Sequence, residues 1–304
     1  MRKQYSFPVT TVTKLFSINS NTYYTARIQK VYINSTNIIL NNQDMLNINF
    51  NNKYLPTNGM YIENGRRLKD IFIEKLGKSG VVKDNKIFFR NLELDYSDAE
   101  IVDNSFDILQ ISCLDFEKVN KNIRKIREEL TQIPLKSSLL KVYLFKRTID
   151  TYSNFENRLQ EKYLDFFNRI RVSIKLKDSD LIKKNILSII GLGPGLTPSG
   201  DDLFIGFITT ALLLKQYYNT YGITSELNEV KKYLSSISSH TLSGIQKGYL
   251  PWILIRIFKL IFNYSTLRFK KEFLKIEEYG HSSGEDLFTG VLLFLENYNL
   301  KIRQ

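Results

Sequence analysis

Two patterns of hydrophobic and polar residues follow one another along the chain. From residue 20 to about residue 112 they alternate with a period of two, as at 24–29, where Tyr, Ala and Ile alternate with Thr, Arg and Gln. This period is typical of half-buried strands. Short runs of the same kind predict further strands at residues 46–50, 60–62, 71–73, 86–90 and 106–111. Turn-forming residues separate the runs, which favours a small antiparallel β barrel or sandwich.

From Cys113 onward the apolar residues recur at steps of three and four, which indicates amphipathic helices. Ser153 and Glu156 have the spacing of a capping box, and Asp178 or Ser179 is placed to cap the next helix. The predicted helices are residues 116–130, 153–174, 179–190, 200–219, 225–237, 241–247, 251–262, 266–277 and 284–298. We therefore predict the α+β class, with a β-rich domain at residues 1–112 and a mainly α-helical domain at residues 113–304.

Composition narrows the classes of protein that the chain can represent. A single cysteine among 304 residues excludes an internal disulfide framework and fits a reducing cytoplasm. The first sixteen residues lack the apolar core of a signal peptide, and no apolar run reaches the roughly 18 residues of a membrane span. We expect a cytoplasmic protein without a membrane partner.

The chain carries 43 Lys and Arg against 31 Asp and Glu, a formal charge of +12. These charges are spread along the sequence without a block of like charge, and no nucleic-acid-binding motif accompanies them. A positive field also attracts small anions such as phosphates and carboxylates. We therefore favour small anionic partners over nucleic acid.

The most unusual stretch is residues 191–202, Gly-Leu-Gly-Pro-Gly-Leu-Thr-Pro-Ser-Gly-Asp-Asp. Its glycines allow close approach of backbone N–H groups to a ligand, and its prolines stiffen the loop. Ser199 is predicted to be the N-cap of the helix that follows, with Asp202 as its capping-box partner. N–H groups at such a helix N-terminus form a cradle for an anion.

This stretch is neither of the two familiar phosphate-binding loops. No Gly-Lys-Ser/Thr follows the glycines, and a helix rather than a strand precedes them. Asp201 and Asp202 would repel a phosphate that came close. Three roles stay open for these two acids: binding a substrate amide or ammonium group, holding Mg²⁺, or orienting the loop by accepting its N–H groups. No cofactor is required by the first or third role.

Eight residues of this stretch occur a second time, 84 positions later. Ser-Gly-Asp-Asp-Leu-Phe-Ile-Gly at 199–206 corresponds to Ser-Gly-Glu-Asp-Leu-Phe-Thr-Gly at 283–290, with six identities. The last residue of each phrase lies seven after the serine, on the same helix face, so Gly206 and Gly290 would permit a close helix contact. Two well-capped helices that pack together are the simpler interpretation. Capping accounts for the serine and one acid, but not for the glycine run or the second acid.

The two histidines lie close to these phrases or between them. His281 lies two residues before the second phrase, and His240 lies in Ser-His-Thr-Leu-Ser-Gly at 239–244. Histidine titrates near neutral pH and suits proton transfer or anion binding, so His281 is a candidate catalytic residue. Simple capping is the better account of the segment around His240. Two histidines without a cysteine pair do not make a zinc site, and no nucleophile-elbow pattern is present.

At these residues the chain resembles a known family. Residues 191–202 with Leu203 and Gly206 look like the signature of the AllH-type family, long catalogued as a domain of unknown function. Residues 280–290 are similar to its second motif, although Ser282 stands where that motif usually has Thr. Residues 241–245 with Gly248 resemble a weaker intervening motif. The resemblance covers mainly residues 185–295.

The resemblance implies a subunit of oxamate carbamoyltransferase, an enzyme of anaerobic allantoin and purine breakdown that is a complex with two other types of protein. The reaction converts oxalurate and phosphate to oxamate and carbamoyl phosphate. The expected partners are thus these small anions and the other subunits. A non-catalytic subunit, whose glycine loop docks onto a partner, is the alternative.

Within this scheme each candidate residue receives a role. His281 protonates the leaving oxamate nitrogen or holds phosphate, and Asp201 or Asp202 accepts a hydrogen bond from the substrate's N–H groups. Binding of phosphate or of the oxyanion is expected from backbone N–H groups and hydroxyls of the loop, completed by the second phrase. These binding residues are Gly193, Gly195, Thr197, Ser199, Gly200, Ser283 and Asp286. No metal ligand is assigned, and Mg²⁺ is the one metal that stays open for this site.

Overall fold

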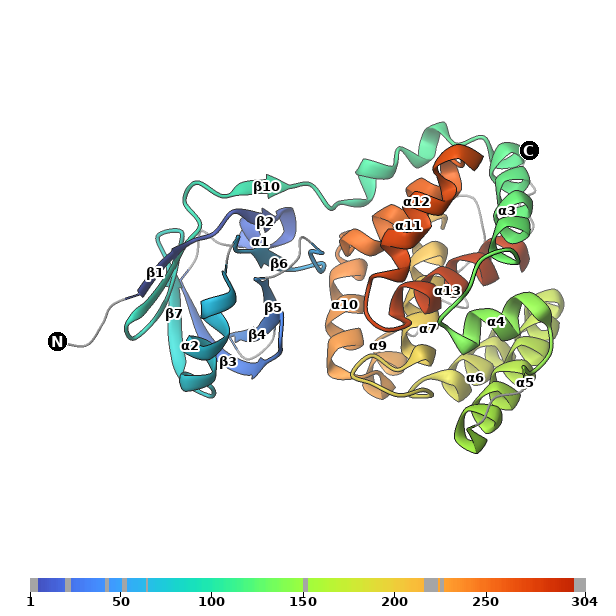
Figure 1. Cartoon of the computed structure of the whole chain (residues 1–304), viewed down its shortest axis with the longest axis horizontal. Helices are drawn as coiled ribbons and strands as arrows, with labels where there is room; N and C mark the ends of the chain where they lie inside the picture. The colour runs from blue at the N-terminus through green and yellow to red at the C-terminus, as the bar shows by residue number, and fades with distance from the viewer. Residues whose placement is uncertain are drawn as a thin grey trace. The chain divides into compact units, whose positions relative to one another are not determined.

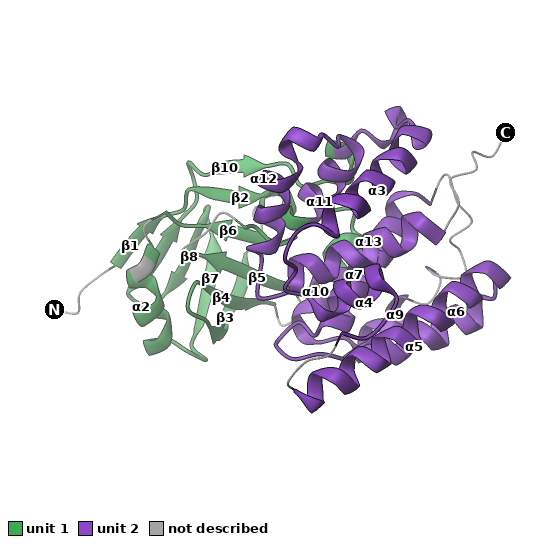
Figure 2. Ribbon diagram, turned by 45° about the vertical axis from the view of Figure 1, so that its right-hand side comes forward, with its two compact units in different colours: residues 1–108, 243–253 green, residues 109–242, 254–304 purple. Residues whose placement is uncertain are grey.

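The computed structural model describes residues 5–19, 23–41, 44–50, 54–63, 65–149, 153–215, 224 and 227–297. The chain forms two compact units (Figures 1 and 2). Unit 1 contains residues 1–108 and 243–253, and unit 2 contains residues 109–242 and 254–304. Unit 1 is built on a sheet and unit 2 on helices, so the predicted α+β class is confirmed.

Unit 1 has a ten-stranded mixed sheet with the strand order β1-β9-β8-β7-β3-β4-β5-β6-β2-β10. The strands are β1 (Tyr5–Pro8), β2 (Thr11–Thr13), β3 (Tyr24–Val31), β4 (Ser35–Leu40), β5 (Asp44–Asn49), β6 (Gly59–Tyr61), β7 (Ser79–Lys83), β8 (Lys86–Phe89), β9 (Leu92–Asp95) and β10 (Glu100–Val102). Among the described strands, the pairs β1–β9, β2–β10 and β5–β6 are parallel and the others antiparallel. The alternation of apolar and polar residues favoured an antiparallel sheet, but the observed sheet is mixed.

The sheet curls because the same two chain segments occur near both of its ends. β1 runs through Val9 and Thr10 into β2, and β9 runs through residues 96–99 into β10. The bend is tied by backbone bonds from Val9 N–H to the Asp95 carbonyl (2.7 Å) and from Glu100 N–H to the Thr10 carbonyl (3.0 Å). Apolar residues of alternate strand positions, among them Ile28 and Ile38, are fully buried inside this curled sheet.

Two of the strand predictions for this part of the chain are wrong. Residues 71–73 belong to helix α2 (Leu68–Glu74), where the adjacent Ile71 and Phe72 are both buried. Residues 106–111 fall in two 3₁₀ turns, Phe106–Leu109 and Ile111–Cys113. Short apolar runs fit a helix turn as well as a strand, because three residues cannot distinguish the two periods. A second short helix, α1 (Lys14–Asn19), follows β2.

Unit 2 is helical, and two of its helices extend into residues 243–253 of unit 1. Its helices are α3 (Phe116–Leu130), α4 (Ser138–Phe145), α5 (Asn154–Leu176), α6 (Ser179–Ile189), α7 (Ser199–Leu213), α9 (Leu227–Val230), α10 (Ser236–Gln246), α11 (Trp252–Phe262), α12 (Thr266–Glu277) and α13 (Ser283–Asn297). The helices predicted at 116–130 and 266–277 have these bounds. The bounds predicted at 225–237 and 241–247 are wrong. The described part of the first range holds the short helix α9 and a 3₁₀ turn, Lys231–Tyr233, and α10 already begins at Ser236.

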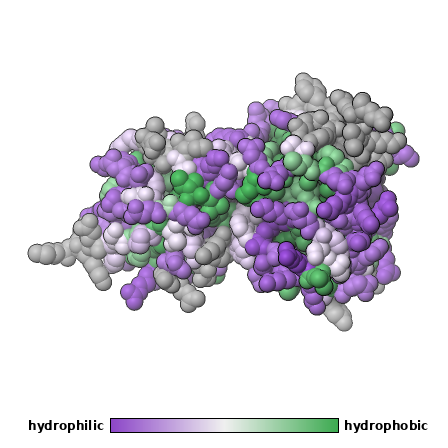
Figure 3. Space-filling model, turned by 90° about the horizontal axis from the view of Figure 1, so that it is seen from above, coloured by the Kyte–Doolittle hydropathy of each residue, from purple (hydrophilic) through white to green (hydrophobic). Residues whose placement is uncertain are grey.

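The N-terminal caps of α5 and α6 confirm the sequence prediction. The Ser153 hydroxyl accepts the N–H of Glu156 at 3.3 Å, and Asp178 accepts the N–H of Leu181 at 2.9 Å. α7 ends at Leu213, before the end predicted at residue 219. The end predicted at residue 298 and the start predicted at residue 225 lie outside the described residues. No helix in the described ranges is both long enough and apolar enough to cross a membrane. On the face shown in Figure 3, hydrophilic side chains cover much of the surface and apolar ones form smaller groups.

Candidate functional site

The two repeated phrases begin helices α7 and α13, which cross in close contact (Figure 1). A Cβ atom added at Gly206 would overlap the carbonyl oxygen of Leu287, and one added at Gly290 would overlap that of Leu203. These two contacts are equivalent, because Gly290 corresponds to Gly206 and Leu287 corresponds to Leu203 at the offset of 84 positions. The predicted close approach at the two glycines is confirmed.

The equivalence extends to the helix in front of each phrase. A Cβ atom at Gly200 would overlap the carbonyl oxygen of Ile189, the last residue of α6. A Cβ atom at Gly284 would overlap that of Ile276, near the end of α12. Each phrase therefore belongs to a helix–loop–helix, α6–α7 in one case and α12–α13 in the other, and the two are built alike.

The loops within these two motifs share their backbone bonds but differ in length. Gly200 N–H donates to the Leu192 carbonyl at 2.9 Å, and Gly284 N–H donates to the Tyr279 carbonyl at 3.1 Å. The next residue in each loop is a glycine with positive φ, 112° at Gly193 and 67° at residue 280. Five residues, 194–198, then precede the serine of the first phrase, whereas only residues 281–282 precede that of the second. The first loop is thus three residues longer.

Two predictions for the first loop are wrong in their detail. Pro198 is the N-cap of α7 and makes no side-chain capping bond, so Ser199 is the first helical residue rather than the cap. The N–H of Gly200 is engaged by the Leu192 carbonyl and is not available to an anion. The positive φ angles of Gly193 (112°) and Gly195 (101°) do require glycine there, and no neighbouring atom lies within 4 Å of a Cβ at Gly195.

The first acid of each phrase holds backbone N–H groups. One oxygen of Asp201 accepts the N–H of Gly191 at 2.9 Å and the other accepts that of Ser235 at 2.8 Å. Glu285 likewise accepts the N–H groups of Ser137, at 2.7 Å, and of the residue before it. The serine in each case immediately precedes a helix, α10 or α4. Among the three roles considered for Asp201, this geometry matches orientation of the backbone.

The second acid of each phrase differs in its partners. Asp286 accepts hydrogen bonds from the hydroxyls of Ser137 and Ser282, the latter at 2.9 Å. Asp202 is only 6 % exposed, yet its Oδ2 atom accepts no hydrogen bond from the described residues. A buried carboxylate oxygen without a donor is costly, and native proteins reserve such groups for a ligand, a water or a catalytic role.

Hydroxyl groups surround the two second acids. Thr197 Oγ1 and Ser283 Oγ lie 3.1 Å apart, and both hydroxyls act as hydrogen-bonding neighbours of Asp202. Ser199 acts in the same way on Asp286. Each second acid is therefore served by the first residue of the opposite helix, Asp202 by Ser283 and Asp286 by Ser199. The site combines parts of both helix–loop–helix motifs.

Burial dominates the electrostatics of the pair. It raises the pKa of Asp202 well above its usual value, and the negative charge of Asp286 raises this pKa further. Burial also raises the pKa of Asp286, to about 7, because the hydroxyls of three neighbouring serines offset only part of the desolvation. The positive ends of the α7 and α13 dipoles favour the charged forms of both acids, and desolvation outweighs them.

Two tyrosines also interact electrostatically with the pair: Tyr163, which is buried, and Tyr279, which is partly buried. Burial raises the pKa of Tyr163 and of Tyr279, and the charges of Asp286 and Asp202, respectively, raise them further. Both phenols are thus neutral at physiological pH. Neither tyrosine was predicted from the sequence as part of the site.

Neither histidine is hydrogen-bonded to the two second acids in the described structure. His281 is exposed in the turn between α12 and α13. His240 bonds through Nδ1 to the Ser236 carbonyl at 2.7 Å, a contact within α10.

A metal has no ready set of ligands in the part of the chain that the structure describes. No group of three or more His, Cys, Asp or Glu side chains is placed there to hold a metal ion. We derive no chemical step that requires Mg²⁺.

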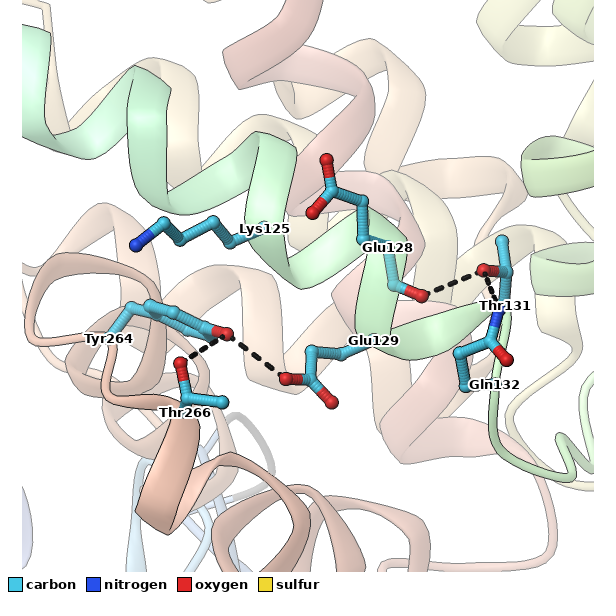
Figure 4. Close-up of a pocket in the computed structure, with 7 residues that line it drawn as sticks. All are labelled: Lys125, Glu128, Glu129, Thr131, Gln132, Tyr264 and Thr266. Atoms are coloured by element: carbon cyan, nitrogen blue, oxygen red, sulfur yellow. Dashed lines mark hydrogen bonds between the residues drawn. The ribbon is translucent and has the colours of Figure 1, made fainter.

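Unit 2 also has a polar surface pocket of about 500 Å³ (Figure 4). In it the Tyr264 hydroxyl donates to Glu129 at 3.3 Å and lies 3.3 Å from the Thr266 hydroxyl. Its lining residues are Lys125, Glu128, Glu129, Thr131, Gln132, Tyr264 and Thr266. None of the site residues expected from the sequence belongs to this pocket.

Together these features define an α+β protein whose helical unit carries a cluster of buried carboxyls and hydroxyls at two equivalent helix N-termini. Residues 189–295, about a third of the chain, match the model of the family described as oxamate carbamoyltransferase subunit AllH. The match runs from the last residue of α6 into α13 and includes both phrases, so the expected resemblance to this family is confirmed. Neither the curated proteins nor the solved structures gave a match to the chain.

Proposed function

We propose that the chain is a subunit of an oxamate carbamoyltransferase-like complex and takes part in converting oxalurate and phosphate to oxamate and carbamoyl phosphate. One observation carries this proposal. The segment that matches the family contains both helix N-termini that meet at Asp202, where a buried carboxyl oxygen lacks a donor among the described residues. The complex and the reaction are those that the family description and the sequence resemblance imply.

In this scheme phosphate attacks the ureido carbonyl carbon of oxalurate through an oxyanionic tetrahedral state. The first loop supplies the groups that bind anions: the backbone at Gly193 and Gly195 and the hydroxyl of Thr197. Gly195 is exposed and its surroundings are open, so a ligand has room to approach its backbone. Asp202, at the base of the loop, contacts the reacting part of the substrate.

His281 retains a role at the solvent side of the site. It is exposed in the turn that corresponds to the first loop, two residues before Ser283. An imidazole there suits binding of the incoming phosphate. His281→Gln keeps polarity but removes the imidazole ring, and should raise the KM for phosphate more than it lowers kcat.

The first experiment measures carbamoyl phosphate formed from oxalurate and phosphate by the purified chain, with and without the other subunits. Turnover by the chain alone would place the whole site in this protein. Turnover only in the complex is expected if the site is shared with a partner. The absence of turnover in both cases would contradict the proposed substrates.

Asp202→Asn tests whether this acid is more than a structural group. We expect kcat/KM to fall by about 100-fold or more, the usual cost of removing a group that takes part in proton transfer. Thermal stability should change little, because an amide fills the same space in a site where the charge is already disfavoured. Asp165→Asn, an exposed position on α5, is the matched control. Equal losses of activity and stability would indicate a purely structural acid.

A non-catalytic docking subunit is the second candidate, favoured by one observation. Leu196, in the three-residue excess of the first loop, is 50 % exposed, as an anchor for a partner subunit would be. Calorimetry with phosphate and with oxamate on the isolated chain distinguishes the two functions, since a docking subunit should give no binding heat. Leu196→Glu should then abolish assembly with the partners.

A further inference from the structure

The two second acids occupy equivalent positions but unequal surroundings. Asp286 accepts hydroxyl hydrogen bonds on both of its oxygens, from Ser137 and Ser282. Asp202 has a buried Oδ2 without a donor among the described residues. Hydrogen bonds to a carboxylate stabilise its charged form, and burial without them favours the neutral form. The surroundings therefore separate the two acids into one suited to carry charge and one suited to carry a proton.

We propose that Asp202 is held as a neutral carboxylic acid by its charged neighbour Asp286, and that Asp202 is the general acid of this site. A carboxylic acid kept neutral in a buried site donates a hydrogen bond or a proton at physiological pH. Asp286 is the positioning residue, acting through Asp202 rather than on the substrate. The acid's part in turnover rests on the function proposed above; its protonation does not.

The raised pKa values of the pair agree with this geometry. Burial and the charge of Asp286 both raise the pKa of Asp202, whereas three serine hydroxyls limit the rise at Asp286 to about 7. Two like charges so close to one another do not both persist, and the proton stays where hydrogen bonds to the charged form are fewest.

Other titratable groups lie near Asp202 and Asp286, but none of them is suited to act as the general acid. Asp201 and Glu285 lie beside the two acids in the same helical turns, and both are saturated by backbone N–H groups. Tyr163, on α5, and Tyr279, between α12 and α13, have raised pKa values and stay neutral over the range in which the acids titrate.

The proton balance of the reaction fits such a donor. A phosphate oxygen forms a bond to the ureido carbonyl carbon, and the bond from that carbon to the oxamate nitrogen breaks. Asp202 gives its proton to this nitrogen, so that it leaves as the amide of oxamate. The hydrogen of the attacking hydrogen phosphate then restores the proton of Asp202. No oxidant, reductant or further reactant is needed.

Infrared difference spectroscopy on the purified full-length chain, without substrate, tests the protonation directly. We expect a C=O stretch of a protonated carboxylic acid at pH 7 that Asp202→Asn removes. In Asp286→Asn the same band should titrate away at lower pH, because the neighbouring charge that raises the pKa of Asp202 is gone. Asp165→Asn should leave the band unchanged. A full-strength band in the Asp202 variant, or no band at pH 7 in the wild type, would overturn the proposal.

The pH profile of kcat/KM supplies the second test, in the active complex. A general acid must be protonated, so activity falls above its pKa, and this basic limb should move to lower pH by a unit or more in Asp286→Asn. Thr197→Ala removes a hydroxyl that favours ionised Asp202 and should move the limb to higher pH. Because Thr197→Ala keeps both acids, its pH profile still tests the proposal if a variant of either acid does not fold.

Profiles that do not move in either variant would exclude Asp202 as the acid. An infrared band that behaves as expected in a chain without turnover would leave the protonation standing and remove the proposed reaction.

Discussion

Gly206 and Gly290 set the distance between α7 and α13, and alanine at either position distinguishes packing from helix propensity. In an exposed helix interior, glycine to alanine stabilises by roughly 1 kcal/mol. Here the added Cβ meets a carbonyl oxygen of the facing helix, so we expect Gly206→Ala to destabilise by about 1–3 kcal/mol, the usual cost of overpacking. Urea denaturation measures the effect. Gly290→Ala, the equivalent change, should have the same sign, and a stabilised variant would contradict the close crossing.

The residue scale also shows what could be inferred in advance. The spacing of serine and glycine predicted the helix contact, because position seven returns to the face of position zero. The different roles of the two adjacent acids could not be predicted from the sequence. Asp201 and Asp202 are adjacent and identical, yet both oxygens of Asp201 accept backbone N–H groups, whereas the Oδ2 atom of Asp202 lacks a donor among the described residues. That difference depends in part on Ser235, whose N–H group Asp201 accepts and which comes from a distant segment that carries no motif.

At the scale of elements, the helix–loop–helix repeat was visible only in part. The sequence repeat starts at the serine, because the loops before it differ by three residues and disrupt the alignment. The structure restores the correspondence through equivalent backbone bonds, from Gly200 to Leu192 and from Gly284 to Tyr279. Long helices such as α12 were predicted with correct bounds because their apolar period persists over several turns. The short run at 71–73 was not, because one turn of helix and three residues of strand expose the same pattern.

The extra residues of the first loop allow the fold and the site to be separated. Deletion of residues 194–196 gives this loop the length of the second one and leaves Thr197 and Pro198 in the places of His281 and Ser282. We expect the melting temperature to fall by only a few degrees, because the helix crossing is retained. Phosphate binding by calorimetry should be lost, because Gly195 and its open surroundings are removed. Retained binding would show that the anion does not use this loop.

At the scale of the whole molecule, the buried pair makes stability depend on pH. An unfolded Asp has a pKa of about 3.9, whereas the pKa of folded Asp286 is about 7 and that of folded Asp202 is also raised well above its usual value. Between these values the folded state binds more protons than the unfolded chain. The stabilisation is therefore fully present below about pH 4 and is lost as the pH rises through 7. Glu285, whose pKa burial also raises, acts in the same direction.

We accordingly expect the free energy of unfolding to fall by an amount of the order of 2 kcal/mol between pH 5 and pH 8. Urea denaturation at several pH values measures it, and Asp286→Asn should flatten the curve by removing one titrating group and lowering the pKa of Asp202. The pKa of Asp95 is lowered to about 2 by hydrogen bonds from Ser97, so its contribution changes only below about pH 4. Asp95→Asn should therefore shift the curve between pH 5 and 8 without changing its slope. Stability that rises with pH in the wild type would mean that the pair is charged in the folded protein, and the neutral acid at Asp202 would be excluded with it.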